Sequence, residues 1–595
     1  MFHWKLVPSK LWLVISLLSL VLLAVACGTA ATPTPTPIAA APTAKATTIA
    51  VGATPSPILT PKATPAPAPT FTPAALATPP KVSPVRLKIA VTPPTQETNY
   101  PYHTPVSGIW QLSPMYETLL RLTPSGEIGP MLATSWEMSA DAKTWTIQLR
   151  RGVQWQENWG EFAARDVVHS LGRMTAEDAL SSQVGTWRAQ LEAPKNPLGE
   201  RVAVADPHQV ILRLASPAPR LDQLLSSAWD LQILSKAEFD AQGVAGLTTR
   251  PAPGTGPYKF VERKLGSYLL YKRVEGKHWR VTPDFEELQI FLVPEEGTRI
   301  AMLLTGEADI TLVSPDLERQ AESRGMKVIP STLPSTGVMV VLAGNYLPTG
   351  PQYDPSAPWT KKKVREAMNR AINRDELNKA LLAGRGETQM VIWFDASLPG
   401  WNPEWPEKFK EMYGYNPTRA RELLAESGYA KGFKMKLWSV ARSNLPQMNS
   451  VAEAIAVYWK AIGLDVEVAP TDYAPIRAKS REATLNDPWS YTTPFFLNPE
   501  DGLRATFHSK GPAVRFFNSK EGIDEPIEKL LASSDPKERE RLLREIGGFI
   551  FNDYTHVPLF WLKATFAVNP KVVAEYATHG VPIPPVQLEY IKAVR

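Results

Sequence analysis

The chain has 595 residues, of which 44% are hydrophobic and 21% are charged, and it contains a single cysteine. This length exceeds what one hydrophobic core usually supports, so the chain is expected to divide into several units. A single cysteine excludes disulfides within the chain, CxxC redox sites and zinc sites built from several cysteines.

The net charge of +5 originates in the first 84 residues. Five of the 64 basic residues and none of the 59 acidic residues lie there, so the rest of the chain carries 59 of each. The five are Lys5, Lys10, Lys45, Lys62 and Lys81. A nucleic-acid partner requires a basic face on the folded part, and this balance argues against such a partner.

The segment 1–27 combines Lys5 and Lys10 with an apolar run over residues 11–26. This pattern is typical of a secretory signal peptide or a membrane anchor. The sequence AVAC, which ends at Cys27, resembles a bacterial lipobox. The resemblance implies a lipoprotein signal peptide, lipidation of Cys27 and anchoring to the outer face of the cell membrane. The alternative is an incidental cysteine on an uncleaved signal anchor, and both interpretations place the rest of the chain outside the cytoplasm.

Residues 28–84 consist mainly of Thr, Pro and Ala, with runs such as PTPTP and PAPAPT. Proline fixes the backbone φ angle, and this segment has no periodic apolar face that could pack on a core. We therefore interpret it as a semi-rigid spacer. At about 3.1 Å per residue its contour length is on the order of 150 Å, enough to hold the folded part away from the membrane.

The folded region is expected to begin near Val85 with a strand at 86–92 and a loop that carries Tyr100 and Tyr102. Residues 115–120 are interpreted as the start of a helix. Alternating apolar residues predict the following strands. These lie at 134–138, at 144–149 and on both sides of the Asp206–Pro207 turn within 202–214, and further strands are expected at 267–273 and 287–293.

The second half of the chain is richer in helix signals. Asn373 stands three residues before Glu376, a capping-box spacing, and Gly384 is expected to end that helix. Asn416 and Pro417 suit the N-cap and the first helical position of another helix. Helices are predicted at 296–304, 361–372, 447–462 and 537–551, and strands at 464–468 and 553–562. Alternation of helices with strands indicates an α/β fold.

Signatures of common enzyme classes are missing. The chain has no GxxxxGK, HExxH or GxSxG sequence, and its eight histidines show no i, i+4 pair that would suit a metal. A Ser-x-x-Lys spacing occurs at Ser534–Lys537, but Pro536 follows two capping residues there. The better interpretation is a helix start with Ser534 or Asp535 as N-cap. We therefore predict no catalytic residue, no metal site and no cofactor.

Several phrases in a fixed order point to a family. YETLL, PMLATSWE and TWTIQLRRGVQW lie within 116–169, GTGPYKF and EGKHW follow, and VREAMNRAINRDEL and NPTRARELLAESGY come later. Together they resemble the bacterial extracellular solute-binding proteins of family 5, the peptide and nickel class that serves ATP-driven importers. The resemblance implies an α/β fold of the two-lobed periplasmic-binding-protein type (class II, cluster C) with a small extra domain. It places lobe I at 85–115, 251–335 and 553–595, the extra domain at 116–250 and lobe II at 336–552.

The same resemblance suggests ligand contacts. The stretch 486–509 is similar to the segment in which members place a tryptophan on the ligand and then an aspartate on the amino terminus of a bound peptide. Trp489 and Tyr491 fit the aromatic part, whereas Thr492 and Thr493 stand where the carboxylate is expected. Tyr100 and Tyr102 are further candidates, with ordinary loop aromatics as the alternative. Without the carboxylate, peptides, sugars, opine-like compounds and metal chelates all stay open.

The implied function is capture of a peptide or another small polar solute between two lobes, with delivery to the permease and ATPase subunits of an ABC importer. The protein is expected to be a monomer without enzymatic activity. Two alternatives stay open: a binding protein that presents its ligand to a membrane sensor, and a secreted hydrolase of cell-wall or polysaccharide material.

Overall fold

The computed structural model describes residues 86–594, apart from 95, 105, 194–197, 244–246, 248–249, 351–352, 441–444, 446, 512 and 580–585. These residues belong to one compact unit, Pro79–Arg595. The predictions for the signal peptide, Cys27 and the spacer concern residues outside the described part. Among the described residues, no helix is both long and apolar enough to cross a membrane.

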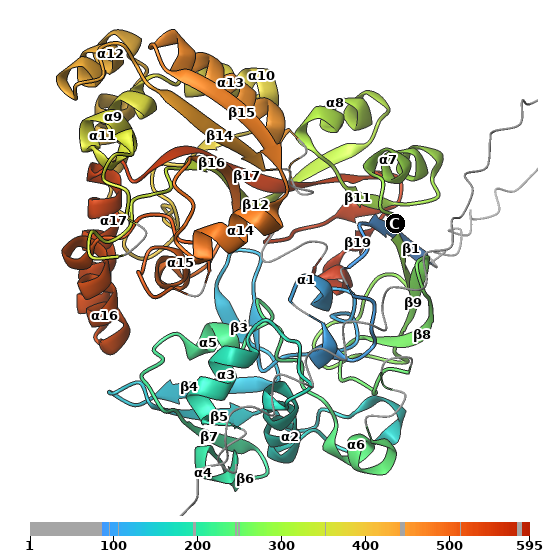
Figure 1. The fold of residues 1–595 in the computed structure, drawn as a ribbon. Coiled ribbons are helices and arrows are strands. Elements are labelled where there is room, and N and C mark those ends of the chain that lie inside the picture. Colours follow the sequence, from blue (N-terminus) through green and yellow to red (C-terminus); the bar gives the residue numbers. More distant parts are fainter. Residues whose placement is uncertain are drawn as a thin grey trace, which may run out of the picture. The chain divides into compact units, whose positions relative to one another are not determined.

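One large mixed sheet forms the framework of the described part (Figure 1). Its strand order is β15-β14-β16-β12-β17-β11-β1-β10-β9-β8, and β13 pairs with β17. The strands are β1 (Arg86–Val91), β8 (Tyr258–Lys264), β9 (Tyr268–Arg273), β10 (Glu287–Leu292), β11 (Ile310–Leu312), β12 (Lys327–Val341), β13 (Glu387–Thr388), β14 (Lys434–Val440), β15 (Asp465–Thr471), β16 (Trp489–Pro494) and β17 (His556–Val568). Parallel strand pairs such as β1 with β10 and β14 with β15 require helical crossovers, which confirms the α/β prediction.

The two longest strands, β12 and β17, join the two halves of this sheet. β16 pairs with residues 336–341 of β12, whereas β11 pairs with residues 566–568 at the other end of β17. Between these ends the pairing of β12 with β17 is irregular, with register shifts around Pro334. We call the half with β1 and β8–β11 lobe I and the half with β14–β16 lobe II. The irregular stretch between them is the expected hinge, because the register shifts interrupt the regular ladder there.

Lobe II buries both faces of its sheet. Val338 and Val340 of β12 point into one hydrophobic cluster, and Met339 and Val341 point into another on the opposite face. Helix α13 (Met448–Ala461) packs on β14 and β15. The other helices of this lobe are α9 (Lys362–Arg370), α10 (Arg374–Leu382), α11 (Trp405–Tyr413), α12 (Pro417–Glu426), α14 (Tyr473–Arg481), α15 (Pro499–Thr506), α16 (Glu525–Ala532) and α17 (Pro536–Asn552).

A separate antiparallel sheet with the order β4-β5-β7-β6 lies within residues 133–213. Its strands are β4 (Ala133–Met138), β5 (Thr144–Leu149), β6 (Val202–Asp206) and β7 (Gln209–Arg213). Trp145, Ile147 and Leu149 are buried along β5, which confirms the predicted alternation. Helix α2 (Ala164–Thr175) packs on β6 and β7. The predicted boundaries of the lobes and of the extra domain stay predictions.

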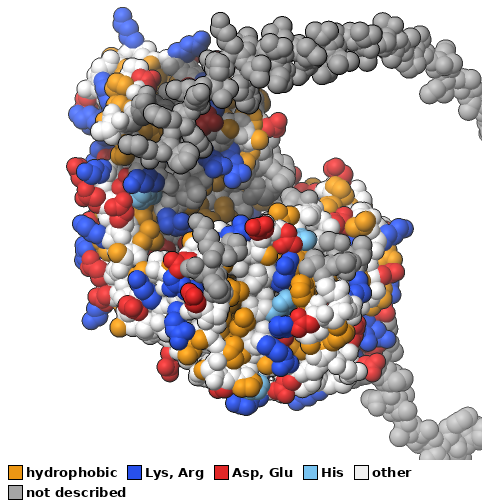
Figure 2. Space-filling model, turned by 60° about the horizontal axis from the view of Figure 1, so that its bottom comes forward, with side chains coloured by type: hydrophobic (Ala, Val, Ile, Leu, Met, Phe, Trp, Pro, Cys, Tyr) orange, Lys and Arg blue, Asp and Glu red, His pale blue; other side chains and the backbone are white. Residues whose placement is uncertain are grey.

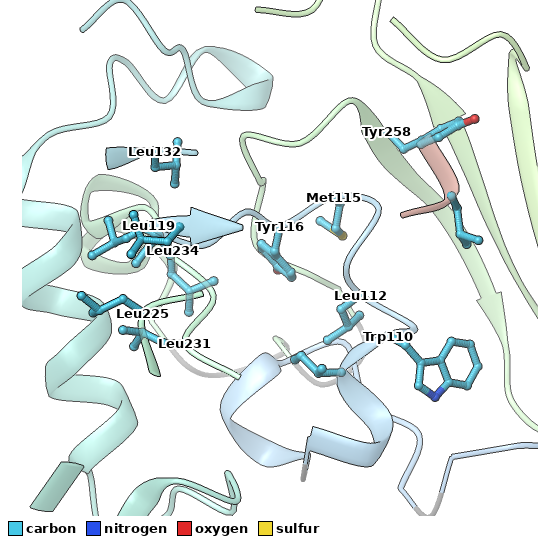
Figure 3. Packing of buried hydrophobic residues seen from close by; sticks show 14 of the residues in the cluster. Trp110, Leu112, Met115, Tyr116, Leu119, Leu132, Leu225, Leu231, Leu234 and Tyr258 are labelled. Atoms are coloured by element: carbon cyan, nitrogen blue, oxygen red, sulfur yellow. The ribbon is translucent and has the colours of Figure 1, made fainter. Parts of the chain in front are cut away.

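A buried hydrophobic core connects lobe I with this smaller sheet (Figure 3). Leu119, Leu225, Leu231 and Leu234 gather at one side of it, and Met115, Leu112 and Tyr258 continue it toward the large sheet. The other elements of this region are β2 (Leu120–Leu122), β3 (Ile128–Pro130), α1 (Val106–Ile109), α3 (Val184–Leu191), α4 (Leu198–Arg201), α5 (Leu221–Leu224), α6 (Lys236–Gln242), α7 (Glu296–Thr305) and α8 (Pro315–Ser323).

Two local predictions were wrong. Residues 115–120 do not begin a helix; they lead into strand β2, and the amide of Leu120 bonds the carbonyl of Leu225 in place of a helical partner. Helix α10 ends at Leu382 with Ala383, not Gly384, as its left-handed C-cap at a φ of 51°. The predicted N-caps are confirmed: the side chains of Asn373, Asn416 and Asp535 accept backbone N–H groups of their helices.

Candidate functional site

Strand β16 carries the three candidate residues of lobe II, and its pleat divides them between two faces. Trp489 is paired with Val341 and Tyr491 with Met339, whereas Thr492 is paired with Val338. Because successive side chains of a strand point to opposite faces, Trp489 and Tyr491 share one face and Thr492 points to the other. Thr493, not Thr492, is therefore the threonine on the face of the two aromatic residues.

Trp489 and Tyr491 belong to a cluster of aromatic rings. Their ring centroids are 4.8 Å apart, and Tyr473 and Phe516 each lie 6.4 Å from Trp489. Trp489 has no exposed surface, and its Nε1 has no hydrogen-bond partner among the described residues. A buried indole N–H usually finds an acceptor, so this unpaired donor marks a place where a partner could bind.

Trp393 extends this cluster from a loop of lobe II. Its ring stacks on Phe516 at an interplanar angle of 6° and a centroid distance of 6.5 Å, and its Nε1 donates to Thr506 Oγ1 over 3.1 Å. Its φ of 68° is uncommon for so large a residue. Trp393, Tyr473 and Phe516 were not predicted as part of the site, because nothing local in the sequence indicates that they approach the aromatic residues of β16.

Tyr100 and Tyr102 lie elsewhere, in the core of lobe I and the smaller sheet. The Tyr100 hydroxyl accepts a hydrogen bond from Arg173 Nε at 2.7 Å, and the Tyr102 hydroxyl donates to the carbonyl of Gln232. Burial raises the pKa of Tyr102 well above its usual value. The structure does not bring these two residues together with Trp489 and Tyr491, and their role as ligand contacts stays a prediction.

The acidic residues that follow β16 in the sequence are held by helix α15. Glu500 forms an ion pair with Arg539 of α17, and burial raises the pKa of Asp501. His508 Nε2 lies 3.4 Å from a carboxylate oxygen of Glu528. Among the described residues there is no group of three or more His, Cys, Asp or Glu side chains that could hold a metal ion.

Charges of both signs are interspersed on the surface. In the face shown in Figure 2, Lys and Arg side chains lie interspersed with Asp and Glu side chains, among uncharged and hydrophobic surface. Many of these charges form helix-surface pairs, such as Arg541 with Glu538 and Glu545. Such exposed pairs contribute little to stability.

Comparisons with known proteins agree with this fold. The family model described as "Bacterial extracellular solute-binding proteins, family 5 Middle" matches residues 127–513, more than half of the chain. The dipeptide-binding protein of Escherichia coli K12 is 28% identical over 457 residues, which cover 73% of this chain and 81% of that protein. Heme-binding protein A of Haemophilus influenzae is 27% identical over 476 residues, with coverages of 75% and 81%.

Solved structures with the same fold include HbpA2 from Haemophilus parasuis, with a TM-score of 0.70 and 22% identity. The match covers 86% of this chain and all of that one. NikA from Brucella suis in complex with Fe(III)-EDTA has a TM-score of 0.68 at 21% identity and the same coverages. The sequence profile and the two-lobed fold agree, and this chain belongs to the bacterial extracellular solute-binding proteins of family 5.

Proposed function

We propose that this protein is the solute-binding component of an ABC importer, which captures a small polar solute between its lobes and delivers it to the permease. The family match over residues 127–513 is the observation that carries this proposal. Two lobes joined by β12 and β17 suit the task, because bending at the irregular stretch near Pro334 would close them on a solute.

The aromatic cluster of β16 is the part of lobe II that we assign to solute binding. Trp489 and Tyr491 offer flat apolar surface and an unpaired N–H donor. Such a surface grips a ligand by shape and stacking, and a few polar groups fix its orientation. Relatives of this chain are named for dipeptides, glutathione and heme, so the solute class extends beyond free peptides.

The proposal also covers how the protein is anchored to the membrane and which subunits it works with. Cys27 is assigned as the lipidated residue after signal-peptide cleavage, and the Pro- and Thr-rich segment 28–84 as the spacer between membrane and folded part. We assign a monomer that works with permease and ATPase subunits and that performs no chemical reaction. Incorporation of labelled palmitate into the wild type but not into Cys27→Ala would support the anchor, and equal labelling would contradict it.

Native mass spectrometry of the purified protein, followed by thermal-shift measurements, tests the function. The panel contains Gly-Leu, glutathione, cellobiose and a nickel–histidine chelate. A retained intact solute, or a rise in melting temperature with one of these compounds, is the expected result. Chemical conversion of a bound compound would contradict a pure binding function, and an unliganded protein that responds to no compound would contradict solute capture from these classes.

A further inference from the structure

Gln389 is a buried side chain without a hydrogen-bond partner. It follows the short strand β13, and its backbone amide donates to the carbonyl of Leu559 in β17 over 3.2 Å. The residue has no exposed surface, yet neither Oε1 nor Nε2 of its side chain has a partner among the described residues. Buried amides are rarely left in this state, because burial without a hydrogen bond removes their hydration and gives nothing in return.

The surroundings of Gln389 are shaped to admit its amide. A Cβ atom built on Gly337 of β12 would lie 2.5 Å from Gln389 Nε2, 2.7 Å from the ring of Trp561 and 2.8 Å from Thr493 Cγ2. The amide of Gln389 therefore lies directly over the glycine backbone, between an aromatic ring and a threonine. Any larger residue than glycine at 337 would displace it.

This position continues the face of the sheet that carries the aromatic cluster. Trp489, Tyr491 and Thr493 alternate along β16, and Gly337 is the partner of Thr493 in the adjacent strand. Trp489 Nε1 is another buried group without a partner among the described residues, and Trp489 lies four residues before Thr493 on β16, on the same face. Three unpaired polar atoms thus lie on one face: two donor groups and one acceptor.

The apolar neighbours place Gln389 near the hinge. Trp561 packs with Leu333 and Phe495 in a small cluster of its own, and Leu333 belongs to the irregular stretch of β12. The nearest charged side chains in the sequence have partners: Glu387 pairs with Lys563 at 2.9 Å and Arg385 with Glu318 at 2.7 Å. No unpaired charge from these residues is available to Gln389.

We propose that Gln389 binds the solute, and that it recognises an uncharged group which offers both a hydrogen-bond donor and an acceptor. This inference rests on the proposed function and names the chemistry of the same site. A primary amide presents one acceptor and two donors in a plane, so it is complementary to another amide or to a pair of neighbouring hydroxyls. A free ammonium or carboxylate would satisfy only one side of it. Amide groups of a blocked peptide and hydroxyls of a sugar share this chemistry.

The stability of the ligand-free protein gives the first test, with Gln156 as the matched control. Gln156 Nε2 donates to the carbonyls of Gly256 and Tyr258 at 3.0 and 2.9 Å, so it has a structural role. Urea denaturation of the solute-free protein should show a lower midpoint for Gln156→Leu and an unchanged or higher midpoint for Gln389→Leu. A midpoint for Gln389→Leu as low as that of the control would overturn the proposal, because Gln389 would then serve the fold.

Binding measurements give the second test, by calorimetry with N-acetyl-alanyl-alaninamide and with cellobiose as two uncharged probes. The wild type should bind one of them, and Gln389→Leu should bind that probe about tenfold more weakly, the effect of losing one or two hydrogen bonds. Preference between the two probes distinguishes an amide from a hydroxyl ligand.

Other outcomes separate this proposal from the proposed function. Equal affinities of wild type and Gln389→Leu would overturn the role of Gln389 while solute binding stands, and so would a protein that binds Gly-Leu with free termini but neither uncharged probe. If the wild type binds none of these three compounds and no compound of the earlier panel, both proposals are contradicted.

Discussion

At the scale of single residues, the side chain of Arg280 contacts segments that lie far apart in the sequence. Its Nε lies 2.7 Å from Glu117, and its Nη1 lies 2.8 Å from Glu589 and 2.7 Å from the hydroxyl of Tyr590. The side chains of Arg280, Glu117 and Glu589 are nearly buried, and desolvation raises the pKa of Glu117 although Arg280 opposes that rise. The family phrase YETLL, the residue that follows EGKHW and the C-terminal segment are thus connected through one guanidinium.

Replacement of Arg280 by Met should destabilise the protein by about 3–5 kcal/mol, because it leaves Glu117 buried without a cation. The folded-state pKa of Glu117 should then rise further above its unfolded value. Since protonation favours the fold in that case, the loss should be largest at neutral pH and should shrink as the pH falls toward this pKa. Urea denaturation at several pH values measures it. Arg419→Ala, at a cluster of exposed ion pairs, should leave the stability nearly unchanged.

The same substitution at two buried tryptophans can show whether Trp489 contacts solute or only packs in the core. Trp459 is equally buried, but its Nε1 donates to the carbonyl of Met368 at 2.9 Å. Both Trp489→Phe and Trp459→Phe should lower stability by about 1–2 kcal/mol through lost packing. Only Trp489→Phe should also weaken solute binding, by about 1 kcal/mol or fivefold. Unchanged affinity of Trp489→Phe, measured by calorimetry with a solute found on the panel, would assign Trp489 to the core alone.

At the scale of elements, the segment GTGPY (Gly254–Tyr258) forms a backbone junction with residues 114–115, in which the two chain segments are hydrogen-bonded directly. The amide of Gly256 donates to the carbonyl of Met115 at 2.9 Å, and Tyr258 N donates to the carbonyl of Pro114 at 3.2 Å. A Cβ on Gly254 would overlap the carbonyl oxygen of Met115. Glycine is required here because two backbone segments are in direct contact, and the contact aligns lobe I with the segment that leads to the smaller sheet.

Gly254→Ala should therefore destabilise the protein by more than 2 kcal/mol, since relief of the overlap requires movement of backbone. Gly185 in helix α3 is the control, because a Cβ there would meet no atom within 4 Å. Gly185→Ala should leave stability unchanged or raise it by up to about 1 kcal/mol. Thermal denaturation of both variants decides the matter, and equal melting temperatures would show that the junction adapts to a side chain.

The same elements show what the sequence could and could not predict. Helix starts such as Asn416–Pro417 were predictable because a cap and its helix are neighbours in the chain. The helix predicted at 115–120 was wrong because the backbone there is held from a distance: the amide of Leu120, at the start of β2, bonds Leu225, about a hundred residues away. Thr492 was chosen by position in a family phrase, but which face a residue takes depends on pairing with β12. Gln389 showed no local signal at all, since its distinction is the absence of a partner in three dimensions.

For the whole molecule, β12 and β17 make the two lobes one mechanical and thermodynamic unit. Their pairing continues from Lys327–Val568 to Val341–His556, so residues of the same two strands complete the sheet of each lobe. Unfolding of one lobe would therefore expose strands on which the other depends. A solute that binds only the folded protein should stabilise both lobes together, by about 2.7 kcal/mol at a concentration one hundred times its Kd.

Hydrogen exchange followed by mass spectrometry tests this coupling. On addition of saturating solute, amides of β10 in lobe I and of α13 in lobe II should both exchange more slowly, although α13 packs on β14 and β15 away from the face of Trp489. Under conditions where exchange requires global opening, the slowing should correspond to the stabilisation expected from the measured Kd. Protection confined to α14–α16 would show that the lobes open independently, and closure would then be a local event around the aromatic cluster. Protection in both lobes would place the energetic link in β12 and β17, the strands that both lobes share.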